Sequence, residues 1–354
     1  MKTCLTAMSL ARQAKDPNSL VRERAIRSLG EVDHPRAVKA LAGALSDTHR
    51  GVQLAAAEAF NRRQAPEALD ALLATLEHRK TETSVQQMIL RALANMGDAG
   101  VDKIVARLSD PNCRARPELA EVLGRMKQKQ AVQPLVALLN DGDVKVRKEA
   151  AHALGKIGDP SAVEPILKEL DDDRWLLRSE FAEALGRLGD KRAVEPLIKL
   201  LKDQKWLVQR SAARALAALG DPRATPALLD LLKSDNEDVR TCAADVLGSL
   251  GDPQAVAPLL ALMNDPEAAS AAVNGLRILL KSAAEKLSVA DLTTLSKLPD
   301  PNRANYEVDE SADSFSGSST MARAVSGEIK NVGLKKLDIS GLRKLAADAL
   351  ARKR

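Results

Sequence analysis

One motif returns at a fixed interval through the middle of the chain. Leucines at positions 154, 185, 216 and 247 each lie 31 residues after the one before, and each is followed four residues later by a Gly-Asp pair. Repetition at this period is typical of supersecondary units that cannot bury their apolar faces alone and therefore stack on their neighbours. The sequence predicts an all-α, right-handed solenoid.

The boundary between two repeats is marked by Gly158, Asp159 and Pro160. Glycine suits the left-handed residue that ends a helix, because it lacks a Cβ. Aspartate then caps the next helix, and proline suits its first position, where no N–H partner is needed. Pro165 lies further along, so we expect a kink there.

Each repeat contains two helices, A and B, with one apolar face each. Helix A carries apolar residues at 163, 166, 167 and 170, and helix B carries them at 177, 181, 184, 185 and 188. Both sets have the spacing of one helical face. Asp171, Asp172 and Asp173 break helix A and cap helix B. Counting by this template predicts nine helix pairs, the last of them degraded.

The remaining chain divides into a cap and two tail segments. Ser288 and Asp291 have capping-box spacing and open a short helix that closes a solenoid domain of residues 1–298. Residues 299–328 hold six acidic side chains and little apolar content, which predicts a disordered acidic linker. Residues 329–354 hold eight Lys or Arg and two Asp, with an amphipathic helix expected from about Ser340.

Composition narrows the classes of function. The net charge of +5 is concentrated in the tail, so the solenoid is nearly neutral and a basic nucleic-acid groove is not indicated. Aromatic residues are 2% of the chain, which suits base stacking and cofactor cages poorly. Cys4, Cys113 and Cys242 have no metal-ligand or disulfide spacing. We expect no catalytic, cofactor or metal site, no membrane span, and a cytoplasmic location.

The repeats resemble the HEAT family, in particular the short bacterial type named after phycobilisome lyases. Their pattern is an aspartate in the A–B turn, Val/Leu-Arg next, then Ala-Ala, Ala-Leu-Gly and Gly-Asp-Pro. Gln53 and Gln209 depart from it, since arginine is expected at both positions. The resemblance covers about residues 1–281 and implies an Asp–Arg ladder that ties successive turns together. It carries over to Asp16 with Arg22, and to Asp141, Arg147, Asp172 and Arg178.

Enzymatic relatives within this family leave one alternative open. Deoxyhypusine hydroxylase holds iron with repeated His-Glu pairs, and no His-Glu dipeptide occurs here. HEAT-like DNA glycosylases need aromatic residues and a basic groove, whereas this solenoid is nearly neutral and poor in aromatic residues. Bilin lyase subunits, which act on a phycobiliprotein chromophore, share the repeat type. A lyase-type subunit is therefore the alternative to a non-enzymatic adaptor.

Trp175 and Trp206 are 31 residues apart and open helix B of successive repeats. Each indole either covers the edge between stacked turns or forms part of a binding rim, because tryptophan is enriched at binding hot spots.

Rows of charged residues on helix B would line the concave face. They either form a solvated face with i,i+4 pairs or clamp an acidic segment of a protein partner. The rows consist of Glu121, Arg125, His152, Lys156, Glu183, Arg187 and Arg214.

The sequence thus predicts a scaffold that binds one protein on its concave helix-B face. The C-terminal helix, tethered by the linker, is expected to bind a second partner and to fold on binding, because so short a helix is marginal alone in water.

Overall fold

The computed structural model describes residues 2–78, 82–265, 268–298 and 339–353. Helices and turns account for these residues, and no strand occurs among them. The chain forms two compact units, Met1–Glu169 and Leu170–Arg354. The linker predicted at 299–328 lies outside the described residues, as do residues 329–338.

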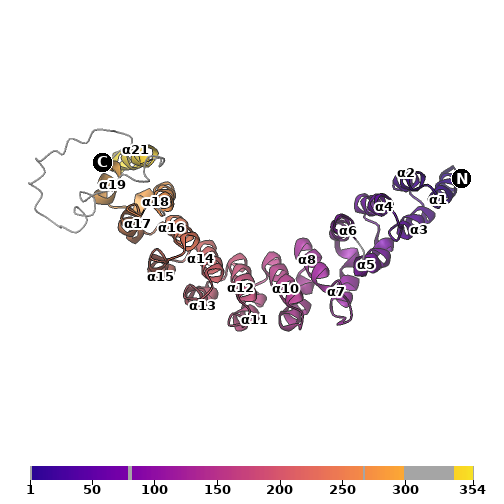
Figure 1. Ribbon diagram of the computed structural model, residues 1–354, viewed down its shortest axis with the longest axis horizontal. Coiled ribbons are helices and arrows are strands. Elements are labelled where there is room, and N and C mark those ends of the chain that lie inside the picture. The colour runs from indigo at the N-terminus through magenta and orange to yellow at the C-terminus, as the bar shows by residue number, and fades with distance from the viewer. Residues whose placement is uncertain (1, 79–81, 266–267, 299–338, 354) are drawn as a thin grey trace, which may run out of the picture. The chain divides into compact units, whose positions relative to one another are not determined.

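The first unit alternates A and B helices, which form two rows in Figure 1. Each B helix from α4 to α10 packs on the B helix before it. The A helices are α1 (Lys2–Gln13), α3 (Pro35–Ala44), α5 (Leu69–Glu77), α7 (Val101–Leu108), α9 (Val132–Ala137) and α11 (Val163–Lys168). The B helices are α2 (Ser19–Leu29), α4 (Arg50–Arg63), α6 (Thr83–Asn95), α8 (Arg116–Met126) and α10 (Val144–Ile157).

The second unit continues the alternation and closes with two further helices. Its A helices are α13 (Val194–Leu200), α15 (Thr225–Leu231) and α17 (Val256–Leu262). Its B helices are α12 (Trp175–Leu188), α14 (Trp206–Leu219), α16 (Glu237–Leu250) and α18 (Ala269–Ala283), followed by α19 (Val289–Ser296) and α21 (Ile339–Lys353). The nine predicted A–B pairs are all present in the described parts of the chain.

The predicted turn chemistry is confirmed at each regular repeat. Gly158, Gly189, Gly220 and Gly251 end their helices in the left-handed region, with φ of 75°, 73°, 63° and 65°. Asp159 accepts a hydrogen bond from the Ser161 backbone N–H at 3.0 Å. This aspartate caps a 3-10 turn, Pro160–Ala162, and α11 begins only at Val163. Pro165 therefore lies in the first turn of α11, where its missing N–H costs nothing, so this position does not require the predicted kink.

Close packing between B helices depends on glycine. A Cβ added to Gly186 of α12 would lie 2.7 Å from Ala215 Cα and 2.9 Å from Ala215 Cβ of α14. In the first unit, Gly124 of α8 meets Ala153 of α10 at the same two distances. Most neighbouring A helices make fewer contacts than neighbouring B helices. The B helices are therefore the more closely packed layer of each unit.

The C-terminal helix α21 packs on the second unit's own helices. It contacts α18 and α19, and its side chains Ile339, Leu342 and Ala346 are buried. Arg343 Nε donates a hydrogen bond to the Ser296 carbonyl at 3.3 Å, and Lys353 donates to the Leu287 carbonyl. The sequence analysis expected this helix to fold on binding a second partner, whereas its buried side chains pack on the chain's own terminal helices.

The cap formed by α19 was correctly predicted. Ser288 Oγ accepts from the Asp291 N–H at 3.0 Å, and Asp291 Oδ2 accepts from the Ser288 N–H at 3.1 Å. Leu292 and Leu295 on this helix are fully buried. The capping box thus fixes the start of α19, which packs against α21, and α21 in turn contacts α18.

Removing α21 should destabilise the second unit. We expect Leu342→Asp to lower the thermal midpoint of this unit by about 2–8 °C, from a loss of about 1–2 kcal/mol, because it places a charge at a buried apolar contact. Ala347→Asp, at an exposed position of the same helix, should leave the midpoint unchanged. Tryptophan fluorescence melts measure this, since both tryptophans lie in the second unit. Equal midpoints for the two variants would mean that α21 contributes nothing to the fold.

Candidate functional site

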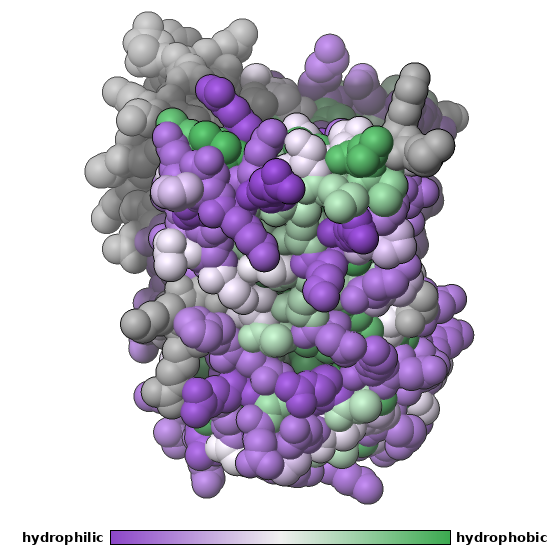
Figure 2. All heavy atoms as spheres, turned by 90° about the vertical axis from the view of Figure 1, so that its right-hand side faces the viewer, coloured by the Kyte–Doolittle hydropathy of each residue, from purple (hydrophilic) through white to green (hydrophobic). Residues whose placement is uncertain are grey.

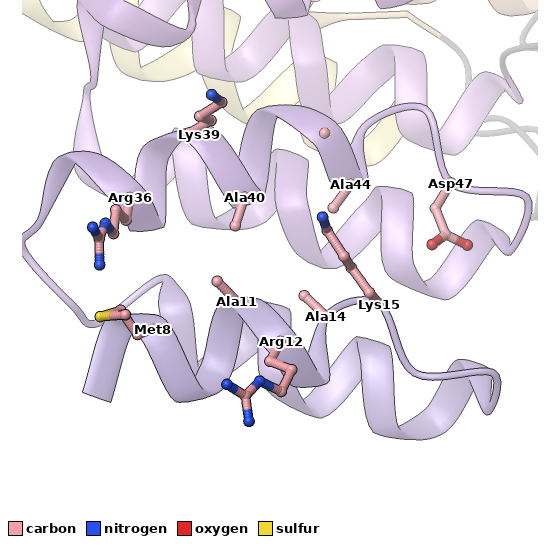
Figure 3. Close-up of a pocket in the computed structure, with 11 residues that line it drawn as sticks. Met8, Ala11, Arg12, Ala14, Lys15, Arg36, Lys39, Ala40, Ala44 and Asp47 are labelled. Carbon is pink, nitrogen blue, oxygen red and sulfur yellow. The ribbon is translucent and has the colours of Figure 1, made fainter. Parts of the chain in front are cut away.

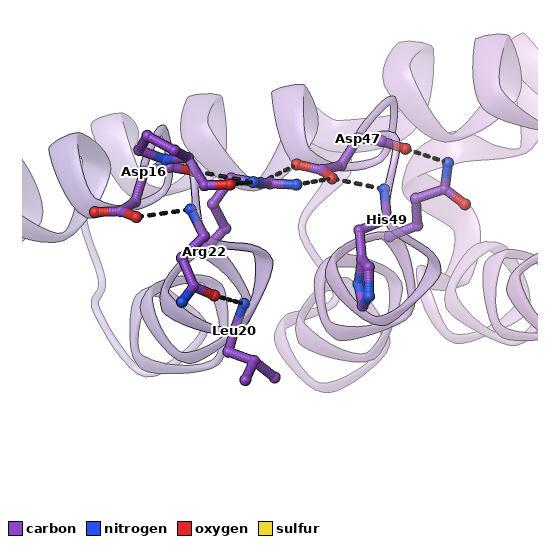
Figure 4. Close-up of polar contacts among 8 residues, drawn as sticks. Asp16, Leu20, Arg22, Asp47 and His49 are labelled. Carbon is purple, nitrogen blue, oxygen red and sulfur yellow. Dashed lines mark hydrogen bonds and ion pairs between the residues drawn. The ribbon is translucent and has the colours of Figure 1, made fainter.

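An arginine near the start of helix B links the turns of successive repeats. Arg22 Nε and Nη2 donate to the two carboxylate oxygens of Asp47, each at 2.8 Å (Figure 4). Its Nη1 donates to the backbone carbonyls of Asp16 and Pro17, each at 3.0 Å. Asp47 also accepts from the His49 backbone N–H at 2.8 Å. One guanidinium therefore closes its own turn and holds the next.

The same arrangement returns in both units. Arg178 binds both carboxylate oxygens of Asp203, at 2.7 and 3.0 Å, and donates to the Asp172 carbonyl at 2.7 Å. Arg116 pairs with Asp141 in the first unit. The sequence grouped Arg22 and Arg178 with the aspartates six residues before them. The backbone carbonyls of those aspartates accept from the two arginines, whereas the carboxylate contact is made with the aspartate 25 residues after each.

Arg147 and the two glutamines show how the ladder varies. Arg147 is buried, donates to the Leu139 carbonyl at 2.8 Å and lies 3.9 Å from Glu169 Oε2. Gln53 and Gln209, which stand where arginine is expected, donate to the carbonyls of Asp47 and Asp203, each at 2.7 Å. Glutamine therefore keeps the bond to the backbone carbonyl within its own turn. In these contacts it is arginine that also reaches the carboxylate of the next repeat.

The electrostatics of these pairs predict an acid-sensitive fold. Burial alone would raise the pKa of Asp203, but the hydrogen bonds from Arg178 and the Lys205 N–H hold that pKa below its usual value. A carboxyl whose folded pKa lies below its unfolded pKa stabilises the fold fully above the unfolded value, and this stability is lost as pH falls through the folded value.

We therefore expect the second unit to lose stability as the pH falls below about 4, the ordinary pKa of an aspartate in the unfolded chain. Asp203→Asn should be less stable than the parent at neutral pH and should lose less on acidification. Asp230→Asn, at an exposed residue of α15, should follow the parent. Urea melts at neutral pH and below pH 4, followed by tryptophan fluorescence, measure the change in the free energy of unfolding of each variant. Parallel pH profiles for parent and Asp203→Asn would contradict the assignment.

On the helix-B surface of the first unit, charged residues pair both within helices and between neighbouring helices. Arg125 donates to Glu121 at 2.6 Å, four residues earlier on α8. His152 and Lys156 lie half-buried on α10. A cavity of about 190 Å³, which neither His152 nor Lys156 lines, lies between α6, α8 and α10. It is lined by Gln86, Gln87, Leu90, Pro117, Glu118, Glu121, Lys145 and Glu149.

In the second unit, Trp206, Arg210 and Arg214 form a stripe along one side of α14. The Arg210 guanidinium lies 5.0 Å from the centre of the Trp206 ring, one turn along the helix. Arg214, a further turn along, is exposed. On α12, Arg187 donates to Glu183 at 3.2 Å, and Glu183 also accepts from Ser211 at 3.3 Å. The predicted residues of this unit therefore lie on adjacent helices.

The two tryptophans differ in exposure. The Trp175 residue is 38% exposed and its neighbour Leu176 is 37% exposed, both at the start of α12. Trp206 is half-buried and covered by Arg210. Trp175 thus offers an open apolar surface, whereas Trp206 is held in place by a cation.

The structure also contains a groove that the sequence analysis did not identify. It lies between α1 and α3 and has a volume of about 510 Å³ (Figure 3). Its lining is Met8, Ala11, Arg12, Ala14, Lys15, Arg36, Lys39, Ala40, Gly43, Ala44 and Asp47. The sequence held one signal of this groove. Gly43 and Ala44 of α3 are equivalent to Lys199 and Leu200 of α13, so small residues stand in α3 where a regular repeat has large ones.

Comparison with known proteins identifies the repeats. A family model of HEAT repeats matches residues 7–94, 78–143, 101–174, 163–241 and 224–277. No curated protein sequence matches the chain. None of the helices that the structure describes is long and apolar enough to cross a membrane.

Several solved structures are similar to this chain at low sequence identity, and the match to a karyopherin shows the fold. The karyopherin Kap121p is 16% identical with a TM-score of 0.54, and the match covers 82% of this chain but 39% of Kap121p. An engineered protein is 23% identical over 98% of both chains, with a TM-score of 0.45. The CpcE–CpcF complex of phycocyanin lyase from Nostoc sp. PCC7120 is 22% identical over 69% of this chain and 87% of that chain, with a TM-score of 0.35. These likenesses concern the fold alone.

Proposed function

Because this chain belongs to the HEAT-repeat family, we propose that it is a non-enzymatic scaffold that binds a segment of a partner protein on its helix-B surface. The supporting observation is the stripe of Trp206, Arg210 and Arg214 on α14. Tryptophan and arginine are the side chains most enriched at protein-binding hot spots. The same helix buries Val208, Ala212 and Leu216 completely, so the stripe stands on a rigid base.

The arrangement favours an acidic partner segment with an apolar side chain. Arg210 and Arg214 are cations on one face of α14, and the carboxylate of Glu183 on α12 is already bound by Arg187 and Ser211. Trp175 and Leu176 add exposed apolar surface on the adjacent helix. Complementary charge would set the orientation of the segment, while the aromatic contact would supply affinity.

The two buried thiols do not have the properties of cysteine nucleophiles. Burial raises the pKa of Cys113 and of Cys242. A cysteine nucleophile works as the thiolate, and a raised pKa keeps the thiol protonated at neutral pH. The second partner expected for residues 329–354 is not part of this proposal, because the buried side chains of α21 are packed on α18 and α19.

A comparison of surface variants tests the scaffold role. The full-length chain is immobilised and incubated with native lysate, and captured proteins are quantified by mass spectrometry after cross-linking. Trp206→Ala combined with Arg214→Glu should reduce a specific captured protein by at least about tenfold. The control is Lys199→Glu, at an exposed residue of α13 in the same unit, and this variant should retain the captured protein.

Two results would contradict the proposal. Equal capture by both variants would place the interaction away from the helix-B surface. A change in the absorbance spectrum of a free bilin on mixing with the chain, with no captured protein, would favour the lyase-type alternative instead.

A further inference from the structure

We propose that the groove between α1 and α3 is a second docking site, which takes an acidic segment of a partner protein with a protruding apolar side chain. The groove belongs to the A layer of the first unit, and none of its lining residues is among those assigned to the helix-B surface. The proposal therefore stands independently of the scaffold function described above.

The interior of the groove is apolar because small residues face one another across it. Ala11 and Ala14 on α1 point toward Ala40 and Ala44 on α3 (Figure 3). Met8, a 47% exposed residue, lies at one end. The volume of about 510 Å³ falls within the range of sites that hold small ligands or several side chains. An aliphatic side chain of a partner can therefore enter between the two helices.

The borders of the groove are cationic. Arg12 and Lys39 point away from the gap on opposite sides, while Lys15 and Arg36 stand at its two ends (Figure 3). No salt bridge involves these four side chains within the part of the chain that the structure describes. The one acidic lining residue, Asp47, is held by Arg22.

This charge distribution identifies the occupant. Lys15 and Arg36 at the ends of an apolar floor, with Arg12 and Lys39 beyond its two sides, complement a segment that alternates carboxylates with an aliphatic side chain. A membrane surface would favour Trp or Phe at the contact, and neither lines the groove. Single-stranded nucleic acid would need aromatic stacking platforms, which the lining also lacks.

Apolar atoms are visible on this end of the protein. In Figure 2, which faces the end of the first unit that contains α1, pale and green atoms run between purple, hydrophilic side chains. Leu5 on α1 and Leu20 on α2 are 66% and 60% exposed. Leu5 lies one turn before Met8 on α1 and thus adds exposed apolar surface to the helix that forms one wall of the groove.

Fluorescence anisotropy with a defined peptide tests the proposal. The probe is a fluorescein-labelled peptide of alternating glutamate and leucine. It is titrated with a full-length parent chain that carries Trp206→Ala and Arg214→Glu, so that the helix-B surface, for which a similar segment is proposed, does not contribute. Lys15→Glu with Arg36→Glu should weaken binding by at least about tenfold, because like charges then face the peptide. Ala40→Leu should weaken it similarly without any change in charge, because the leucine fills the groove.

Matched controls separate the groove from general electrostatics. Arg24→Glu with Arg91→Glu makes the same change in net charge at exposed residues of α2 and α6 and should bind the peptide like the parent. A peptide in which glutamine replaces glutamate should bind at least about tenfold more weakly. Circular dichroism melts confirm that each variant is folded, and the charge variants keep the test decisive if Ala40→Leu does not fold.

Several outcomes would overturn the proposal. These are absence of peptide binding to the parent, equal weakening by the control pair, and full binding by a folded Ala40→Leu variant. Tighter binding of single-stranded DNA or of phosphatidylserine vesicles than of the peptide, lost in the same groove variants, would assign the groove to another class of partner. A parent chain that sediments as a dimer, and as a monomer after Ala40→Leu, would assign it to a second copy of this chain.

Discussion

Leu185→Ala is expected to lower the free energy of unfolding of the second unit by about 2–5 kcal/mol, and Leu154→Ala to do the same in the first unit. Both side chains are 0% exposed. Each belongs to the repeated leucine of helix B, whose neighbours within its unit cannot collapse into the space that alanine leaves. The cost therefore includes both the lost transfer free energy and a residual cavity.

Tryptophan fluorescence separates the two cases, since Trp175 and Trp206 both lie in the second unit. Leu185→Ala should shift the fluorescence transition in urea to lower urea concentration. Leu154→Ala should shift the circular dichroism transition and leave the fluorescence transition in place. Lys199→Ala and Lys168→Ala, at exposed positions of the A helices, are the controls and should change stability by no more than about 0.5 kcal/mol. A ranking in which the lysine variants are the less stable would reverse the assignment of buried and exposed faces.

Gly186→Ala is expected to destabilise the second unit by about 1–3 kcal/mol, although alanine is the better helix former. The added Cβ would lie 2.7 Å from Ala215 Cα. Ala215 Cα belongs to the backbone of α14, so the contact can be relieved only by moving two helices apart. The same substitution at Gly124 meets Ala153 of α10 at 2.7 Å and should cost as much.

Gly43→Ala provides the matched control for Gly124→Ala within the first unit. Both glycines are helical, but a Cβ at Gly43 meets nothing within 4 Å. We expect this control to be neutral or stabilising by up to about 1 kcal/mol, because helix propensity then acts alone. Thermal melts by circular dichroism compare the two. A stabilising Gly124→Ala would mean that the B helices are not held together as closely as their backbones indicate.

These substitutions bear on function because the proposed binding residues stand on the B layer. Trp206, Arg210 and Arg214 keep their spacing only if α14 is fixed against α12, and Gly186 sets how closely those two helices approach. A destabilised B layer should therefore weaken partner capture even when the binding side chains are intact.

Features that depend on neighbours along the chain could be predicted from the sequence. The left-handed glycine at 158, the capping aspartate at 159 and the capping box at 288 and 291 all involve residues within a few positions of one another. The burial of Leu154 and Leu185 followed from helical spacing. Such interactions are determined by backbone geometry over one turn, and the sequence shows them directly.

Features that depend on the distance between helices could not be predicted in the same way. The carboxylate partner of Arg178 is Asp203, because stacking brings the next turn within reach of the guanidinium. The apolar stripe of α21 was visible, but its dock on α18 and α19 was not. The groove between α1 and α3 arises where small side chains on two separate helices face each other.

The sequence by itself therefore determined the repeat, the helix ends and the apolar face of each helix, since these depend on local geometry and on which side chains avoid water. The tertiary structure alone decided which charged group meets which, where α21 docks and where space remains between helices. Those outcomes depend on how closely two backbones approach, and that distance is set jointly by side chains far apart in the sequence, as Gly186 and Ala215 show.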